Sequence, residues 1–180
     1  MDKLILTKKE VLILKECLAE KKETQEALKN IFISGKHIYS TDGKRAVKLT
    51  KSDELRYSAD GEYKIIGENK IGNVGSELFL EKQDVKYPTE IITIMSGFNF
   101  TIFTVTISPD DIKSSLVINL WEKSGRAIDI KYLEILYKIC DYDKVEILSQ
   151  VEEKNSEKPI IMHLSGLNID YIILPYEFKN

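Results

Sequence analysis

Three lysines near the start of the chain have the spacing that most directly suggests chemistry. Lys8, Lys15 and Lys22 recur every seven residues, and residues seven apart lie on one face of an α-helix. A row of ammonium groups on one face contacts nucleic-acid phosphates without reading the base sequence. A solvated helix surface explains the same spacing, and Glu16 and Glu20 reduce the positive potential nearby. The spacing therefore places the three lysines on one helix face, which is either a functional basic surface or a solvated one.

Catalytic and metal-binding patterns are weak in this sequence. His37 and His163 are the two histidines, and both fall in strand-like segments without a cysteine or carboxylate at ligand spacing. Gly72-x-x-Gly75 is not followed by the Lys-Ser or Lys-Thr pair that completes a phosphate-binding loop. We therefore expect no enzyme, no metal site and no cofactor. An enzyme acting on a small molecule is kept as a third hypothesis, and it predicts a pocket holding a charged pair with shifted pKa values.

The composition is typical of a soluble globular protein. The 180 residues, 43% hydrophobic and 31% charged, suffice for one domain or two small ones. The net charge of −3 means that binding to nucleic acid requires a local basic surface or a closed ring, because proteins that bind it by broad electrostatics are usually basic. Cys17 and Cys140 lie in apolar helical patterns and predict buried free thiols in a cytoplasmic protein. The apolar runs are too short for a signal peptide or a membrane span.

Two helices and a series of short strands are expected to position these residues. Thr7 and Glu10 form a Thr-x-x-Glu capping box, which predicts a helix from there to about Lys22. Asp129 is expected to cap a second helix over about 130–140, and Ser108 a shorter one. Strands are predicted over 4–6, 30–34, 37–41, 44–50, 63–66, 77–80, 91–95, 98–107, 116–121, 144–150, 159–164 and 171–174.

The segments between these elements predict turns and loops. Gly35-Lys36 predicts a two-residue turn with the glycine leading, and Asp42-Gly43 predicts a type I′ hairpin turn with positive φ at both residues. Residues 67–76 are loop-like. Helices this few cannot cover both faces of a sheet, so the predicted class is α+β with mainly antiparallel strands and two main helices.

Four short motifs resemble those of the bacterial DNA sliding clamp, the beta subunit of DNA polymerase III, and occur in the clamp order. Thr41-Asp42-Gly43-Lys44-Arg45-Ala46 resembles the clamp hairpin Thr-Asp-Gly-His-Arg-Leu, and Tyr87-Pro88-Thr89-Glu90 resembles the linker Phe-Pro-Asp-Tyr. Ile128-Asp129-Ile130-Lys131-Tyr132-Leu133 resembles the Phe-Asn-x-x-Tyr-Leu start of the final clamp helix. Ile173-Leu174-Pro175-Tyr176-Glu177-Phe178 resembles the clamp ending Val-Met-Pro-Met-Arg-Leu.

The resemblance implies a DNA-clamp-like fold in a divergent and truncated form, because clamp chains are longer and carry three domains with two helices each. We expect residues 1–180 to form a single clamp-like domain with an insertion at about 51–115. The alternative is two trimmed clamp-like subdomains, 1–90 and 91–180.

The resemblance also implies two kinds of site. In clamps a hydrophobic cleft binds a short peptide from polymerases, the clamp loader and repair proteins. The cleft residues here would be Thr41, Gly43, Lys44, Arg45, Ala46, Met95, Ile172, Leu174, Pro175 and Tyr176. An ordinary hairpin turn and a proline ending an edge strand explain the same residues without a cleft. Clamp helices line the DNA channel, and the corresponding DNA-facing residues would be Lys8, Lys15, Lys22, Lys131 and Lys138.

The implied function is non-catalytic. The chain would tether a replication or repair partner to double-stranded DNA, in a ring that several copies form by pairing edge strands. The alternative is a monomeric protein-binding module that keeps the clamp fold without encircling DNA. Three departures from the clamp motifs bear on the cleft: Lys44 replaces histidine, Ala46 replaces leucine, and Tyr176-Glu177 replaces Met-Arg.

Overall fold

The computed structural model describes residues 2–20, 22–52, 59–87, 92–93, 101–106, 118, 122, 128–140, 144–148 and 159–174. The chain divides into two compact units, which we call unit 1 (Met1–Ile91) and unit 2 (Ile92–Asn180). No helix in the described ranges is long and apolar enough to cross a membrane.

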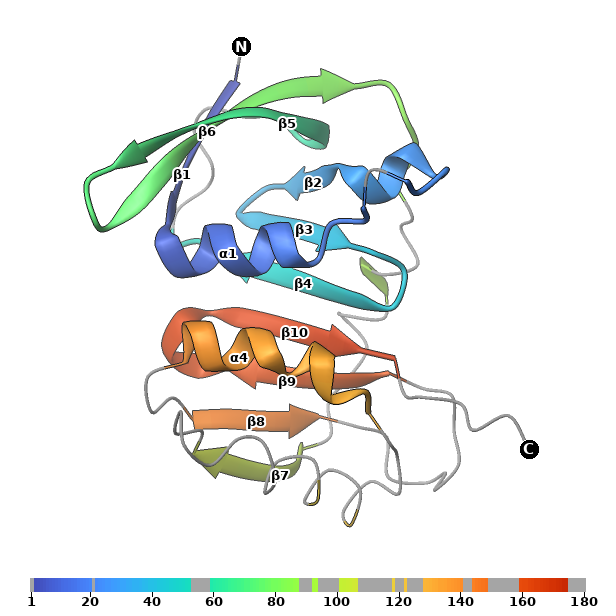
Figure 1. Ribbon diagram of the computed structural model, residues 1–180, viewed down its shortest axis with the longest axis vertical. Coiled ribbons are helices and arrows are strands. Elements are labelled where there is room, and N and C mark those ends of the chain that lie inside the picture. Colours follow the sequence, from blue (N-terminus) through green and yellow to red (C-terminus); the bar gives the residue numbers. More distant parts are fainter. Residues whose placement is uncertain are drawn as a thin grey trace. The chain divides into compact units, whose positions relative to one another are not determined.

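Unit 1 is an antiparallel sheet with a helix on one face (Figure 1). The strand order is β1-β6-β5-β2-β3-β4, and each of these neighbouring pairs is antiparallel. The strands are β1 (Asp2–Thr7), β2 (Ile31–Ser34), β3 (His37–Thr41), β4 (Arg45–Thr50), β5 (Gly61–Ile71) and β6 (Gly75–Gln83). Unit 1 also contains helix α1 (Lys8–Glu16) and the 3₁₀ helix η1 (Glu26–Lys29).

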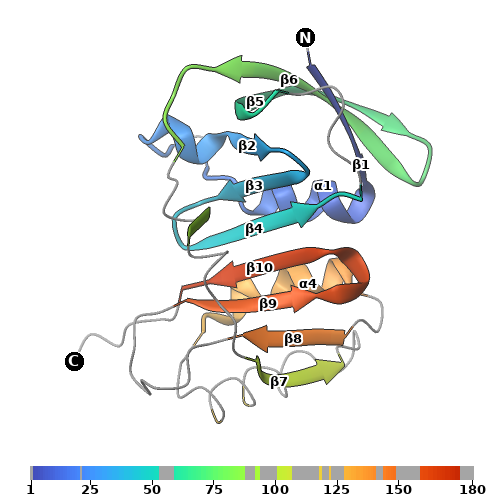
Figure 2. The same cartoon turned by 180° about the vertical axis from the view of Figure 1, so that it is seen from behind.

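The core of unit 1 lies between α1 and one face of its sheet. Alternate residues of the strands are buried because successive strand side chains point to opposite faces. Ile13 and Leu14 of α1 are fully buried, and the Ser40 hydroxyl of β3 donates to the Leu14 carbonyl at 2.8 Å. The view from behind shows β2, β3 and β4 with α1 on their far side (Figure 2). The sheet residues of this core are Leu4, Leu6, Ile31, Ile33, Ile38, Val47, Leu49, Tyr63, Leu78 and Leu80.

The predicted capping box at the start of α1 is confirmed. The Thr7 hydroxyl accepts from the Glu10 N–H at 3.3 Å, and a Glu10 carboxylate oxygen accepts from the Thr7 N–H at 2.7 Å. The other Glu10 oxygen binds Lys51 Nζ at 2.7 Å. The cap therefore also anchors the end of β4 to the start of α1.

Replacing Thr7 with alanine should destabilise unit 1 by about 1 kcal/mol, because the N–H of Glu10 loses its acceptor. Urea unfolding of wild type and Thr7→Ala measures the difference. Thr7→Ser keeps the hydroxyl and should recover most of the loss. Equal midpoints for the alanine variant and wild type would show that the box does not stabilise the helix.

The helix prediction is wrong at its C-terminal end. α1 ends at Glu16 rather than near Lys22, and Cys17 is its C-cap. The Ala19 N–H donates to the Leu28 carbonyl of η1 at 2.9 Å instead of continuing the helix. A tertiary backbone contact therefore overrides the helix propensity of residues 18–22.

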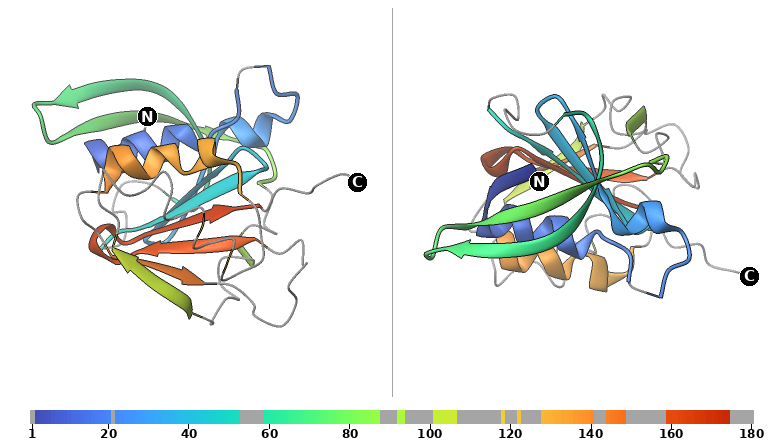
Figure 3. Two further views of the ribbon diagram at one scale, coloured as in Figure 1. Left: turned by 60° about the horizontal axis from the view of Figure 1, so that its bottom comes forward. Right: turned by 90° about the horizontal axis from the view of Figure 1, so that it is seen from above.

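The loop prediction for residues 67–76 is also wrong. β5 and β6 form a long hairpin through these residues, and the pairing runs to Ile71 and Gly75. The ribbon of this hairpin extends beyond the other strands of unit 1 (Figure 3). Its end is held to α1, because the Lys8 N–H donates to the Val74 carbonyl at 3.2 Å.

Unit 2 repeats the arrangement of a helix on an antiparallel sheet. Its strand order is β10-β9-β8-β7, with β7 (Thr101–Thr106), β8 (Lys144–Leu148), β9 (Ile160–Leu164) and β10 (Ile169–Ile173). The 3₁₀ helix η3 (Ile130–Tyr132) precedes helix α4 (Glu134–Ile139), and η4 (Ser165–Leu167) joins β9 to β10. Asp129 caps η3 through the Lys131 N–H at 3.1 Å. The Tyr171 hydroxyl of β10 donates to the Tyr132 carbonyl at 2.7 Å, which fixes η3 against the sheet.

The predicted class is confirmed: both units are α+β with antiparallel strands, and the described residues contain one main helix in each. The predicted strands at 98–107, 144–150, 159–164 and 171–174 correspond to β7 to β10. Cys17 and Cys140, both in the described residues, are buried and form no disulfide, as expected. The helix expected after Ser108 lies outside the described residues, as do most of the strands expected at 91–95 and 116–121. The described residues of those two segments, Ile92, Thr93 and Ile118, are helical, so the strand predictions are wrong there.

Candidate partner-binding and DNA-facing surfaces

The β3–β4 turn, which carries half of the expected peptide cleft, is held together by its own side chains. Asp42 Oδ1 accepts from the N–H groups of Lys44 and Arg45, both at 2.9 Å. The Thr41 hydroxyl accepts from the Gly43 N–H at 3.0 Å and donates to the Arg45 carbonyl at 2.9 Å. The turn is therefore a rigid feature whose backbone donors are already used.

The type I′ prediction for this turn is wrong. Gly43 has a φ of +84°, whereas the φ of Asp42 is not positive. Asp42 instead precedes the two central residues, Gly43 and Lys44, and its N–H donates to the Arg45 carbonyl at 3.2 Å. An aspartate just before the central residues of a turn accepts hydrogen bonds from the backbone N–H groups that follow it. Of the turn residues, only Gly43 has a positive φ. The Gly35-Lys36 turn at the other end of β3 has its glycine leading, with φ +55°, as predicted.

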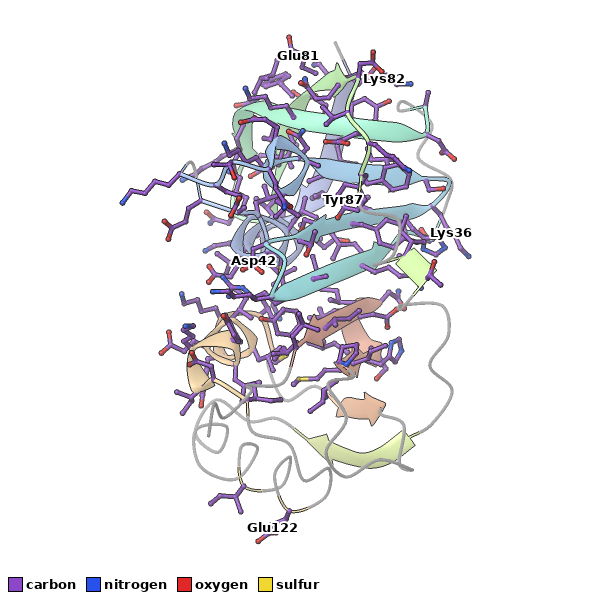
Figure 4. The ribbon with its side chains drawn as sticks, turned by 90° about the vertical axis from the view of Figure 1, so that its right-hand side faces the viewer. Lys36, Asp42, Glu81, Lys82, Tyr87 and Glu122 are labelled. Carbon is purple, nitrogen blue, oxygen red and sulfur yellow. The ribbon has the colours of Figure 1, made fainter. Side chains whose placement is uncertain are left out.

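Arg45 links this turn to the end of α1. Its Nε lies 2.8 Å from Asp42 Oδ2, and its Nη1 lies 3.0 Å from Glu16 Oε1. The Arg45 side chain is only 14% exposed. Figure 4 shows Asp42 at one end of the β3–β4 hairpin and Lys36 at the other. The guanidinium therefore has a structural role, which sequence reasoning missed because Glu16 and Arg45 are distant in the chain.

A buried thiol lies close to this ion-pair cluster. Cys17 has no exposed surface, and burial raises the pKa of its thiol, with Asp42 and Glu16 adding to the rise and Arg45 opposing it. The thiol is therefore held protonated and unreactive.

The other expected cleft residues are only partly described. Thr41 and Ala46 are buried, and Gly43 and Lys44 are exposed. A Cβ added to Gly43 would lie 3.7 Å from the side chain of Leu28. In unit 2, Ile172 is buried and Leu174 is 40% exposed. Met95, Pro175 and Tyr176 lie outside the described residues. Within unit 1 the structure brings together Thr41, Gly43, Lys44, Arg45 and Ala46, and the cleft itself stays a prediction.

The expected DNA-facing lysines of α1 differ in their surroundings. Lys8 and Lys15 are exposed on α1, and Lys15 binds Glu68 of β5. The hydrogen bonds from Lys15 and then Ser76 lower the pKa of the Glu68 carboxyl, so this carboxylate is charged and offsets Lys15. Lys22 lies in a turn beyond the end of α1, so the expected continuous row of three lysines on one helix is wrong.

The lysines of unit 2 also differ from each other. Lys131 pairs with Asp129 at 2.7 Å and lies over the Tyr132 ring, 4.9 Å from its centre. The hydrogen bond to Asp129 raises the pKa of Lys131. Lys138 is exposed on α4. Of the four expected DNA-facing lysines that lie on helices, Lys8 and Lys138 form no ion pair among the described residues.

The histidines have structural neighbours. His37 Nδ1 lies 3.1 Å from Thr50 Oγ1 on the adjacent strand, and His163 Nδ1 contacts Asp170 Oδ1 across the β9–β10 pair. Within the described ranges, no group of three or more histidine, cysteine or carboxylate side chains is placed to hold a metal ion.

Known proteins match this chain in structure but not in sequence. No family model and no curated protein sequence matches the chain. The structure is similar to DNA polymerase III subunit beta from Borrelia burgdorferi (TM-score 0.59, 14% identity), covering 99% of this chain and 65% of that one. It is similar to the sliding clamp of Pseudomonas aeruginosa, with a TM-score of 0.57 and 12% identity, and the match covers 98% of this chain and 67% of that clamp. It is also similar to the beta sliding clamp of C. crescentus, with a TM-score of 0.59 and 10% identity, and the match covers 99% of this chain and 66% of that clamp.

The match extends over nearly the whole chain, although the chain spans only about two thirds of the length of these clamps. The structural match and the four sequence motifs indicate the same fold. At this level of identity the comparison establishes architecture, and the chain has the fold of the bacterial DNA sliding clamp.

Proposed function

We propose that this protein is a non-catalytic sliding-clamp-like protein that tethers a replication or repair partner to DNA. The observation that carries the proposal is the structural match to sliding clamps over 98–100% of the chain. One fold can carry several functions, so the proposal also rests on two features of this chain. These are the exposed Lys8 and Lys138 and the rigid hairpin turn at Asp42.

We propose further that units 1 and 2 are two trimmed clamp-like domains. In the part of the chain that the structure describes, each has one main helix on an antiparallel sheet. β5 and β6 lie between β1 and β2 in the sheet order of unit 1, which supports two domains over a single domain with an insertion at about 51–115.

The proposed mechanism requires several copies of the chain. Among the described strands, β1 is at one edge of the unit 1 sheet and β7 at one edge of the unit 2 sheet. An unpaired strand edge accepts a strand of another chain, and head-to-tail contacts close into a ring when the rotation between copies allows it. A ring stays on DNA with little affinity, which suits a chain of net charge −3.

Light scattering over a range of concentrations tests the ring. A defined multiple of the 20.7 kDa monomer mass supports encirclement. A mass that stays monomeric at every concentration removes it.

The lysines give a test of DNA contact. Replacing Lys8, Lys15 and Lys22 with glutamate should abolish double-stranded DNA binding at low salt, because phosphate contacts supply sequence-independent affinity. Among single changes, Lys8→Gln should weaken binding more than Lys15→Gln, since Glu68 already offsets Lys15. Fluorescence anisotropy at several salt concentrations measures the DNA affinity of the triple and the single variants. Each lost phosphate contact should reduce by about 1 the slope of the logarithm of the binding constant against the logarithm of the salt concentration.

Lys36→Gln is the matched control, because Lys36 is an exposed lysine in the β2–β3 turn rather than on α1. Unchanged binding by the triple variant would contradict the assignment of α1 to the DNA side.

The second candidate is a monomeric protein-binding module with the clamp fold. The pairing of Lys15 with Glu68 and of Lys131 with Asp129 favours it, because both pairs reduce the positive potential on the helices. A monomeric mass together with no DNA binding at low salt would select this candidate.

A further inference from the structure

One edge of β5 is open along most of the strand. β5 pairs with β6 from Glu62 to Ile71, whereas its pairing with β2 ends at Tyr63. No described strand pairs with residues 64–71 on this second side. Residues 68–71 are exposed, and the β5–β6 hairpin extends beyond the other strands of unit 1 (Figure 3). An unpaired edge presents backbone N–H and C=O groups that can pair with another strand.

The part of this edge nearest the hairpin turn is regular. The register of β5 with β6 shifts between Ile65 and Gly67, and it then runs without interruption from Gly67 to Ile71. We call these five residues the outer segment of β5. Bulges and lysines on an edge strand usually prevent pairing with other chains. The bulge lies before the outer segment, so Lys70 is the remaining obstacle within it.

The outer segment also carries a negative charge on the same face as this lysine. Glu68 and Lys70 are two residues apart on the strand, so their side chains lie on one face. Glu68 binds Lys15 of α1 and accepts from the Ser76 hydroxyl, and these bonds lower the pKa of its carboxyl. The carboxylate is therefore charged, and its oxygens have further lone pairs for a second cation.

The two charges are complementary to those of a second copy of the chain in one antiparallel register. Directly opposite residues of two strands share a face, so a two-fold axis must pass through a residue of the segment. An axis at Glu68 or at Lys70 places like charges opposite each other. An axis at Gly67 or at Ile71 places no lysine of the segment opposite Glu68. An axis at Asn69 places Glu68 of each copy opposite Lys70 of the other.

We propose that the outer segments of β5 from two copies pair antiparallel about a two-fold axis at Asn69. The contact is isologous, so the pair of Glu68 with Lys70 occurs twice. On the other face, Ile71, which is 41% exposed, lies opposite Gly67 of the second copy. The Phe79 ring of that copy is next to Gly67, because a Cβ added to this glycine would be 3.1 Å from the ring. The second copy therefore provides an apolar partner for Ile71.

This inference goes beyond the proposed function and does not depend on it. The ring would use the edges β1 and β7, whereas the dimer uses β5, so the two contacts can exist together. The paired segment is short, and we expect a dimer that dissociates on dilution. Changes in the outer segment should leave a ring through β1 and β7 intact, so failure of the dimer and failure of the ring are distinguishable.

Disulfide trapping in the full chain tests the two-fold axis. Directly opposite residues of antiparallel strands have Cα atoms about 4.5–5.5 Å apart, which a disulfide spans. Asn69→Cys should therefore form a disulfide-linked dimer. Asn73→Cys is the matched control, because Asn73 is exposed in the hairpin turn and its two copies would be about 20 Å or more apart. The two native thiols are buried.

We expect Asn69→Cys to link at least about tenfold faster than Asn73→Cys, because pairing raises the effective concentration of the thiols at the axis. Linking is measured from the dimer band on a non-reducing gel. Equal rates for the two variants overturn the proposal.

Charge reversal gives an independent test in the Asn69→Cys chain. Lys70→Glu and Glu68→Lys each create two like-charge pairs, so each should slow linking by about tenfold. General repulsion between chains predicts opposite effects, because the first change makes the acidic chain more negative and the second makes it less negative. A mixture of the two variants should link as a heterodimer, since each glutamate of one chain then lies opposite a lysine of the other.

Mass spectrometry identifies the heterodimer by its mass. Unchanged linking by Lys70→Glu, or a mixture that links no faster than its components, overturns the proposal. Urea unfolding shows whether Glu68→Lys stays folded without its bond to Lys15. If it does not, Lys70→Glu together with the two cysteine variants decides the result.

Discussion

Replacing Gly75 with alanine should destabilise unit 1 by about 3 kcal/mol or more. A Cβ on Gly75 would lie 2.3 Å from the Leu6 carbonyl oxygen, 3.2 Å from the Leu6 carbonyl carbon and 3.3 Å from Thr7 Cα. These are backbone atoms, so no side-chain rotation relieves the overlap. The strands β1 and β6 must separate where Thr7 pairs with Gly75.

The effect of this substitution should spread to α1. Thr7 is both the register partner of Gly75 and the N-cap of the helix. The hydrogen bond from the Lys8 N–H to the Val74 carbonyl lies at the same point. We therefore expect faster amide exchange in β1 and in the first turn of α1, together with a lower urea midpoint.

Gly72 provides the matched control. It has a φ of +56°, and a Cβ added to it would meet no atom within 4 Å, so only its backbone conformation matters. Asparagine tolerates this conformation, and Gly72→Asn should cost less than about 1 kcal/mol. A Gly75→Ala protein as stable as Gly72→Asn would contradict the close approach of β1 and β6.

Short-range signals in the sequence predicted the elements that local chemistry determines. The Thr7–Glu10 capping box fixes the start of α1 because its hydrogen bonds span only three residues. The turn at Gly35-Lys36 and the cap at Asp129 are local in the same way. The clamp resemblance came from short motifs at turns and at element ends, and the fold it implied is confirmed.

The features that sequence reasoning missed depend on contacts between distant residues. α1 ends at Glu16 because Ala19 bonds to Leu28, which no periodicity reveals. The hairpin through residues 67–76 forms because Leu78 and Leu80 of β6 pair with both β1 and β5, although the outer half of β5 has low strand propensity. The pairing of Lys15 with Glu68 joins residues 53 apart in sequence, so the helix lysines looked equivalent in sequence.

Replacing Asp42 with alanine should cost about 2 kcal/mol, because the change removes the acceptor of two backbone N–H groups and a partner of Arg45. The N–H groups of Lys44 and Arg45 lie 2.9 Å from Asp42 Oδ1, and Arg45 Nε lies 2.8 Å from Oδ2. Asp42→Asn keeps an acceptor for the turn and loses the charge, so it should cost about half as much. Urea unfolding of the three proteins measures both steps.

A double-mutant cycle with Arg45→Ala separates the turn from the ion pair. The pair is largely buried, with side-chain exposures of 14% and 16%, so its coupling energy should be about 1 kcal/mol. A coupling near zero would mean that Asp42 acts through the turn backbone alone. A coupling equal to the whole loss would mean that the turn forms without its side-chain acceptor. The expected intermediate value means that Asp42 fixes the backbone of Gly43 and Lys44 while Arg45 fixes the turn to α1. A partner that binds at this turn would then meet a preformed surface, which lowers the entropic cost of binding.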